Sequence, residues 1–119
     1  MRCLIVDDEP SIRECLREIL QLHGHAVIEA DTMCEAMAII QSGTVEVAIV
    51  DGRFPKSRIE NRLNAWGPVL THGARERGIR TLLYSAEEEL VALERRTGHP
   101  ALLKPASMEE ILAVVERGS

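Results

Sequence analysis

The sequence predicts an α/β fold, in which a parallel sheet is covered by helices on both faces. Apolar runs typical of strands alternate five times with segments that repeat apolar residues at helical spacing. The central runs are almost wholly apolar, as expected for strands buried on both faces. Four runs are followed by a polar side chain, so parallel neighbours would gather polar groups at one edge of the sheet.

Two strand–helix pairs are expected in the first 43 residues. A strand over about 2–6 precedes a helix over about 10–22, because Pro10 suits a first helical turn and Gly24 a helix end. A second strand over 25–29 precedes a helix to about position 41, which Thr32 and Glu35 cap. The buried stripe of the first helix is predicted to contain Ile12, Cys15, Leu16, Ile19 and Leu22.

The rest of the chain continues the alternation after an irregular stretch. A strand over 45–50 is followed by residues 52–66, which have no sustained period, and then by a helix over about 67–77. Its inner face is expected to include Val69, Leu70 and Ala74. Strands over 80–84 and 100–103 enclose a helix over 87–96. A last helix is capped by Ser107 and Glu110.

Composition limits the classes of function. A length of 119 residues suits one domain, 1–119, and 45% hydrophobic residues argue against disorder. The net charge of -5 argues against a nucleic-acid partner. No apolar stretch is long enough to insert into a membrane, and no signal peptide precedes the first strand. Cys3 and Cys15 fall at apolar positions as reduced core thiols, which fits a cytoplasmic protein.

Five polar groups follow the predicted strands. Asp7 and Asp8 follow the first, Asp51 the third, Ser85 the fourth and Lys104 the fifth. Clustered carboxylates cannot all stay ionised without a counter-charge, which Lys104 and a divalent cation would supply. Mg²⁺ (or Mn²⁺) and a phosphoryl group fit such a site, whereas the simpler interpretation is a structural Asp–Lys network.

These residues resemble the receiver domain of two-component response regulators over residues 2–118. The resemblance rests on Asp7-Asp8, Asp51, Ser85-Ala86 and Lys104-Pro105 in this order. It implies a flavodoxin-like (βα)5 fold with strand order 2-1-3-4-5. It also implies a signalling domain that is not an enzyme, apart from assisting its own phosphorylation and dephosphorylation.

The resemblance assigns a role to each site residue. Asp51 would accept a phosphoryl group from a phosphohistidine of a sensor histidine kinase or a histidine phosphotransfer protein. Asp8, Asp51 and the backbone carbonyl of Arg53 would bind Mg²⁺, and Asp7 would act mostly through water. Ser85 and Lys104 would contact phosphoryl oxygens, and Pro105 would follow a cis peptide bond. A downstream protein would bind the surface of the fourth helix, fifth strand and fifth helix.

The chain departs from the family at three places. Ala101 replaces the usual aromatic switch residue, and Tyr84 is either a substitute or, more simply, a packing residue. The surplus residues within 56–66 form either a surface insertion or a partner-binding loop that carries Trp66, and no glycine follows Pro55 within a few residues. Arg53 and Glu87 are expected to form an ion pair over the site that slows loss of the phosphoryl group.

Two other functions remain open. A degenerate receiver would bind partners without phosphorylation, which the altered loop and Ala101 favour and the intact set of five polar residues disfavours. An aspartyl-phosphate phosphatase of the haloacid dehalogenase type would need a second Asp at the position of Arg53, which argues against it.

Overall fold

The computed structural model describes residues 1–117, and a five-stranded parallel sheet lies at its centre. The strands are β1 (Arg2–Val6), β2 (Ala26–Ala30), β3 (Val47–Val50), β6 (Arg80–Ser85) and β7 (Ala101–Leu103). Their spatial order is β2-β1-β3-β6-β7, and all neighbours are parallel. Counted within this sheet alone, that order is 2-1-3-4-5, which confirms the predicted doubly wound fold.

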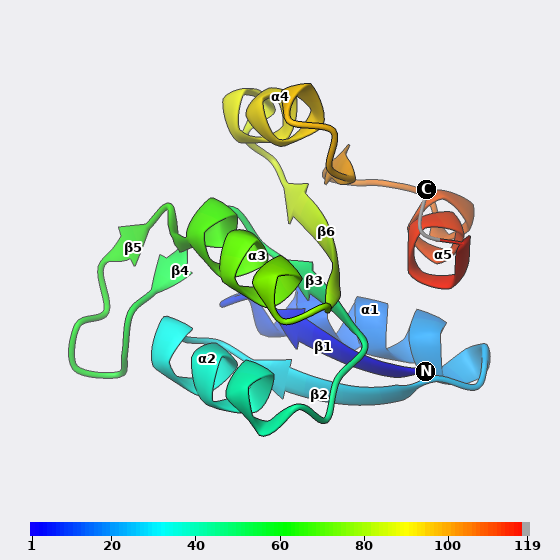
Figure 1. The fold of residues 1–119 in the computed structure, drawn as a ribbon, viewed down its shortest axis with the longest axis horizontal. Coiled ribbons are helices and arrows are strands. Elements are labelled where there is room, and N and C mark those ends of the chain that lie inside the picture. The colour runs from blue at the N-terminus through cyan, green and yellow to red at the C-terminus, as the bar shows by residue number, and fades with distance from the viewer. Residues whose placement is uncertain (118–119) are drawn as a thin grey trace.

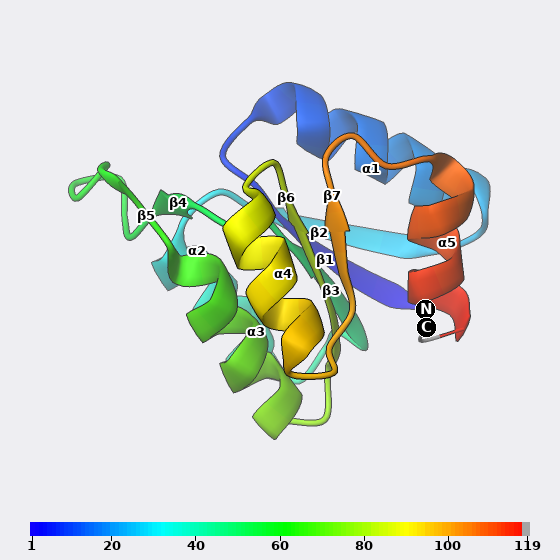
Figure 2. The ribbon, with the colours of Figure 1, turned by 90° about the horizontal axis from the view of Figure 1, so that it is seen from above.

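Helices cover both faces of the sheet. One face is covered by α1 (Pro10–Leu22) and α5 (Met108–Arg117). The other is covered by α2 (Met33–Ser42), α3 (Trp66–Glu76) and α4 (Glu88–Arg96) (Figures 1 and 2). No helix within residues 1–117 combines the length and apolar character needed to cross a bilayer.

The core is aliphatic and divided by the sheet. In β1, Cys3 and Ile5 pack with α1 and α5, whereas Leu4 and Val6 pack with α2 and α3. Successive side chains of a strand point to opposite faces. Both faces are covered here, so β1 is buried from Cys3 onward, which explains its unbroken apolar run.

The predicted helix caps are present. The Glu35 N–H donates to Thr32 Oγ1 at 3.2 Å at the start of α2. Before α5, the Glu110 N–H donates to Ser107 Oγ at 3.1 Å and the Ser107 N–H donates to Glu110 Oε1 at 3.2 Å. Each bond satisfies a backbone group that a helix end otherwise leaves without a partner.

Some predicted inward faces were wrong. Cys15 is exposed and Leu22 is 80% exposed, while Leu20 is fully buried beside Leu16. The helical period of 3.6 residues aligns positions 12, 16, 19 and 20 toward the sheet and turns 15 and 22 away. Val69 is likewise 53% exposed, and Thr71 is buried in its place on α3. Cys3 is buried as predicted, and burial raises the pKa of its thiol to about 11.

The stretch predicted to be irregular contains a β-hairpin. It consists of β4 (Phe54–Pro55) and β5 (Leu63–Asn64), which pair antiparallel and extend beyond the sheet (Figures 1 and 2). Phe54 anchors its base because its side chain is fully buried. The Cys34 N–H donates to the Lys56 carbonyl at 3.0 Å and ties the hairpin to the start of α2. Trp66 packs partly buried against the core.

Candidate functional site

Backbone hydrogen bonds align the carboxyl ends of the strands. The Asp7 N–H donates to the Ala30 carbonyl at 3.2 Å, and the Asp51 N–H donates to the Val6 carbonyl at 2.8 Å. At the other side of the sheet, the Lys104 N–H donates to the Ser85 carbonyl at 2.9 Å. The ladders therefore continue just past the strands, which brings side chains distant in the sequence to one edge.

Three carboxylates meet at this edge. Asp7, Asp8 and Asp51 each offer an oxygen, and these oxygens all lie within 4.8 Å of one another. Lys104 completes the cluster, since its Nζ donates to Asp7 Oδ2 at 2.7 Å and lies 3.2 Å from Asp51 Oδ1. The structure thus brings together four of the side chains that the sequence analysis selected, from the ends of three strands.

Burial and like charge perturb Asp51. Burial, then the nearby Asp7 carboxylate, raises the pKa of Asp51 to about 6, against the opposing effect of Lys104. Burial alone would lower the pKa of Lys104, but its hydrogen bond to Asp7 and the charges of Asp7 and Asp51 outweigh it and raise that pKa. Lys104 therefore carries a positive charge at neutral pH, and the two carboxylates share it.

Ser85 lies beside the loop that carries Asp51. Its side chain is buried, and its Oγ accepts a hydrogen bond from the Glu87 N–H at 3.1 Å. A methyl group placed on Gly52 would approach Ser85 Oγ to 2.6 Å, so the end of β6 packs directly against the residue after Asp51. The Gly52 N–H in turn donates to Asp51 Oδ1 at 2.7 Å.

Gly67 is a residue of this site whose role the sequence analysis missed. A methyl group there would overlap the carbonyl oxygen of Asp51 and come within 2.9 Å of the Gly52 Cα. The Gly67 N–H also donates to the Gly52 carbonyl at 3.1 Å. The sequence analysis noted only that no glycine follows Pro55 within a few residues, and Gly67 lies further along the chain, in the first turn of α3. The position of Gly67 next to Pro68, in a predicted first helical turn, was the sequence feature that could have indicated this close backbone approach.

Tyr84 and Ala101 fill packing positions. Tyr84 is 6% exposed within the core that faces α1 and α5, and its hydroxyl accepts a hydrogen bond from the Ala106 N–H at 3.0 Å. The Lys104 ammonium lies 5.6 Å from the centre of its ring. Ala101 is buried against Leu83 and Val91. The packing interpretation of Tyr84 is therefore favoured over a mobile aromatic switch.

Arg53 and Glu87 form an ion pair between the loops that follow β3 and β6. Arg53 Nε donates to Glu87 Oε2 at 2.7 Å, and both side chains are more than 40% exposed. Between Lys104 and Pro105, the peptide bond is cis.

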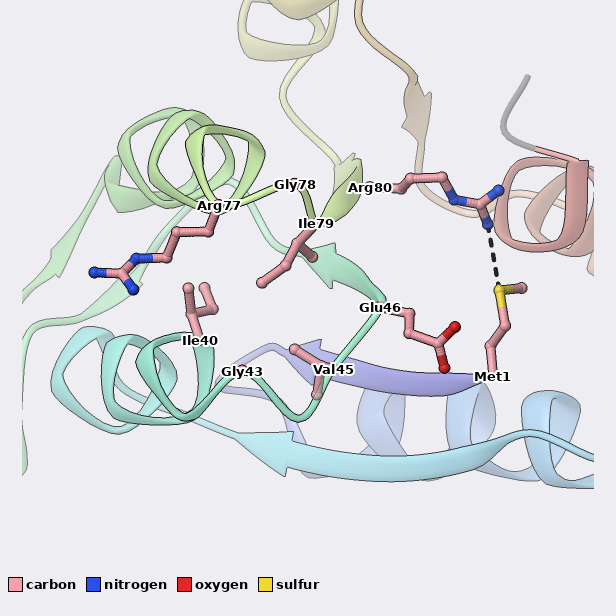
Figure 3. A pocket seen from close by; sticks show the side chains of 9 residues that line it. All are labelled: Met1, Ile40, Gly43, Val45, Glu46, Arg77, Gly78, Ile79 and Arg80. Carbon is pink, nitrogen blue, oxygen red and sulfur yellow. Dashed lines mark hydrogen bonds between the residues drawn. The ribbon is translucent and has the colours of Figure 1, made fainter.

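A separate cavity lies at the opposite end of the sheet. It has a volume of about 560 Å³ and is lined in part by Val45 and Glu46, which precede β3, and by Ile79 and Arg80 at the start of β6 (Figure 3). Asp51 and Ser85 follow or end the same two strands, so this cavity lies away from the acidic cluster. None of the residues that line this cavity was among the predicted site residues.

The acidic cluster suits a hard divalent cation. Carboxylate oxygens are the ligands that Mg²⁺ prefers, and Mg²⁺ retains several waters when few protein ligands are present. Three carboxylates around one shared ammonium leave negative charge that a dication would neutralise. The residues present therefore fit Mg²⁺.

Comparison with known proteins identifies the family. The sequence profile of the response regulator receiver domain matches residues 3–116. The response regulator MprA of Mycobacterium avium is 30% identical over 95% of this chain and 48% of that protein. The chain thus spans about half the length of the curated relatives it matches.

Solved receiver structures have the same fold. The response regulator protein TrrA of Thermotoga maritima, solved in complex with Mg²⁺ and BeF, superposes with a TM-score of 0.79 at 26% identity and covers 98% of this chain and 96% of that one. A CheY-like receiver domain protein of Methanospirillum hungatei has a TM-score of 0.79 at 23% identity, with 98% and 91% of the two chains covered. With the family profile matching nearly the whole chain, this protein belongs to the response regulator receiver domain family, the signalling domains of two-component systems.

Proposed function

We propose that residues 1–119 act as a single cytoplasmic receiver domain that accepts a phosphoryl group on Asp51 and thereby controls a protein partner. The observation that carries this proposal is the position of Asp51, whose carboxylate lies with those of Asp7 and Asp8 and within 3.2 Å of the Lys104 ammonium. Membership of the receiver family supports it.

Asp8, Asp51 and the backbone carbonyl of Arg53 would hold Mg²⁺ (or Mn²⁺), and Asp7 would act through a bound water. The cation would neutralise charge as the phosphoryl group meets Asp51. TrrA, a structural neighbour solved in complex with Mg²⁺ and BeF, offers a precedent for Mg²⁺ bound to a protein of this fold. Asp7 also fixes Lys104 through the 2.7 Å hydrogen bond.

The transfer is a displacement at phosphorus. An Asp51 carboxylate oxygen attacks the phosphorus of a phosphohistidine on a sensor histidine kinase or histidine phosphotransfer protein. The P–N bond breaks, the electron pair returns to the imidazole, and Asp51 becomes an acyl phosphate. Lys104 neutralises equatorial charge during this step, since phosphoryl transfer depends mainly on positioning and electrostatic stabilisation.

Ser85 would connect the phosphoryl group to the surface. Its hydroxyl would bind a phosphoryl oxygen, which draws the loop between β6 and α4 toward Asp51 and shifts an equilibrium between two conformations. We place the downstream partner on the surface of α4, β7 and α5. Ala101 is buried and has no ring to turn, so the change would pass through the loop itself.

Intact-mass spectrometry tests the chemistry. The wild-type protein and Asp51→Asn are treated with acetyl phosphate and Mg²⁺, with EDTA as the control. We expect a gain of one phosphoryl group in the wild type only, and only with Mg²⁺. A gain in Asp51→Asn would assign the acceptor elsewhere. No gain in either protein would favour the phosphorylation-independent binding module, to which the absence of an aromatic residue at position 101 also points.

A further inference from the structure

We propose that Arg13 is a positioning residue, which holds the loop between β1 and α1 in the geometry that binds the divalent cation. The inference rests on the proposed cation site. Arg13 lies in α1 and is not one of the residues proposed to bind the cation. It connects the loop that carries Asp7 and Asp8 to the neighbouring strand β2.

Arg13 makes a fixed set of contacts. Its Nη1 donates to the backbone carbonyl of Asp7 at 2.7 Å, and its Nε donates to Glu29 Oε1 on β2 at 3.2 Å. The Arg13 side chain is only 18% exposed. A planar guanidinium bound in two directions has little freedom left, so the Asp7 carbonyl is held at a defined position relative to β2.

The held carbonyl belongs to the peptide group between Asp7 and Asp8. Asp7 has other restraints, because its Oδ1 accepts the Glu9 N–H at 2.9 Å and its Oδ2 binds Lys104. Within residues 1–117, no hydrogen bond or ion pair holds the Asp8 carboxylate, so its direction depends on the backbone. Fixing that peptide plane aims Asp8 toward Asp7 and Asp51.

Arg17 provides a matched control one turn further along α1. Its Nη1 binds the other oxygen of the same carboxylate, Glu29 Oε2, at 2.6 Å. The structure gives it no bond to the loop, and its side chain is 36% exposed. Removing Arg17 deletes one positive charge and one Glu29 contact, as removing Arg13 does, but leaves the Asp7 carbonyl bound.

The charge of Arg13 and its positioning of the loop predict opposite effects of its removal on cation binding. If Arg13 acted only through its charge, its removal would strengthen cation binding, because a positive group repels a dication. If Arg13 positions the loop, its removal weakens cation binding. Glu29 already neutralises much of the Arg13 charge at 3.2 Å, so we expect the geometric effect to dominate.

The test is calorimetric titration of metal-free protein with MgCl₂. For Arg13→Ala we expect the dissociation constant to rise about tenfold, the low end for residues that orient metal ligands. Arg13→Lys should bind Mg²⁺ almost as weakly, because a flexible ammonium lacks the planar fork that holds Asp7 and Glu29 in fixed directions. Arg17→Ala should match the wild type. Unchanged or tighter binding by Arg13→Ala, or equal weakening in Arg17→Ala, would overturn the proposal.

A second measurement needs no metal. In EDTA, amide hydrogen exchange at Glu9, whose N–H donates to Asp7 Oδ1, should accelerate in Arg13→Ala and Arg13→Lys and stay unchanged in Arg17→Ala. Equal exchange in all four proteins would contradict a positioning role even if Mg²⁺ affinity changed. A wild-type protein that does not bind Mg²⁺ would remove the cation site itself and the inference with it, while wild-type binding with unaltered variants would remove the inference alone.

Discussion

The inner half of the site differs from its rim in how its charges are held. Lys104 and Asp7 pair at 2.7 Å with side chains 12% and 2% exposed, whereas Arg53 and Glu87 pair at the same distance with side chains 46% and 41% exposed. The inner pair belongs to a cluster with Asp8 and Asp51, and the rim pair joins two loops. Equal distances therefore hide very different surroundings.

The comparison separates two kinds of contribution. Removing one partner of a buried pair leaves a charge without compensation, which is strongly destabilising, whereas an exposed pair is screened by water and contributes little. The inner half should therefore determine stability and chemistry together. The rim should affect how long the phosphoryl group persists, with little effect on folding.

The largest effect is expected for Lys104→Met. It leaves Asp7 and Asp51 without their shared ammonium, and we expect the metal-free protein to lose about 3 kcal/mol of unfolding free energy. Phosphorylation by acetyl phosphate should also fall strongly. Urea unfolding in EDTA measures the first effect, and intact mass the second.

Lys56→Met is the matched control, since the chain has one other lysine. Lys56 is 50% exposed and lies 3.9 Å from Glu60, so its loss should leave stability and phosphorylation unchanged. Equal destabilisation by the two substitutions would mean that burial does not distinguish these pairs.

The packing of the inner half predicts the next effect. In Gly67→Ala, the added methyl group would overlap the Asp51 carbonyl, and overpacking of this kind costs about 2 kcal/mol. Gly73 lies on the same helix, and a methyl group added there would have nothing within 4 Å. Gly73→Ala should therefore raise the free energy of unfolding by about 0.5–1 kcal/mol through helix propensity. Opposite shifts in melting temperature would confirm the close approach; shifts of the same sign would contradict it.

A pH dependence follows from Asp51. The pKa of Asp51 is about 6 in the folded protein, whereas the pKa of an Asp in an unfolded chain is about 3.9. Between these two pH values, the folded protein therefore binds a proton that the unfolded protein has already lost. The contribution of Asp51 to the free energy of unfolding is therefore fully present below about pH 4 and is lost as the pH rises through 6.

The substitution Asp51→Asn removes the carboxylate whose ionisation lowers the free energy of unfolding. At pH 7 in EDTA it should stabilise the protein by about 1–2 kcal/mol, after allowing for solvent screening of a partly exposed group. It should also flatten the wild-type decline between about pH 4 and 6. Urea unfolding across this pH range measures both, and adding Mg²⁺ should reduce the wild-type decline. A wild type whose stability rises over this range would contradict the electrostatic account.

The resemblance to receiver domains implied the order of the strands, whereas the edge that carries the polar groups could be predicted from the residues themselves. The reason is that Asp7, Asp51 and Lys104 each follow an apolar run, and parallel strands bring their carboxyl ends together. The distances among them could not be predicted, because they depend on how far each loop turns after its strand. The perturbed pKa of Asp51 likewise needs the burial that only the packed sheet creates.

Two other features depended on tertiary context. Residues 52–66 have no sustained period, yet the buried Phe54 and the backbone bond between Cys34 and Lys56 order a hairpin there. Arg13 belonged to a helix whose pattern showed only its inward face. Its contact with the Asp7 carbonyl involves the backbone, which no pattern of side chains records.

The smallest effect concerns the rim. Arg53→Ala and Glu87→Ala should each change stability by less than about 1 kcal/mol. If the pair shields the acyl phosphate from the attacking water, each substitution should shorten its lifetime by a factor of about 1.4 to 5, the range that 0.2–1 kcal/mol gives. Loss of radiolabelled phosphate from the isolated acyl phosphate measures this lifetime.

The double variant determines whether the two residues act as a pair. A shield that needs both partners is already lost in either single variant, so Arg53→Ala/Glu87→Ala should resemble each of them, and the interaction energy should equal the single effect in magnitude with the opposite sign. Additive shortening would mean that each side chain hinders water separately. Unchanged lifetimes in both single variants would discard the shield and leave the 2.7 Å contact as a surface ion pair without influence on the signal.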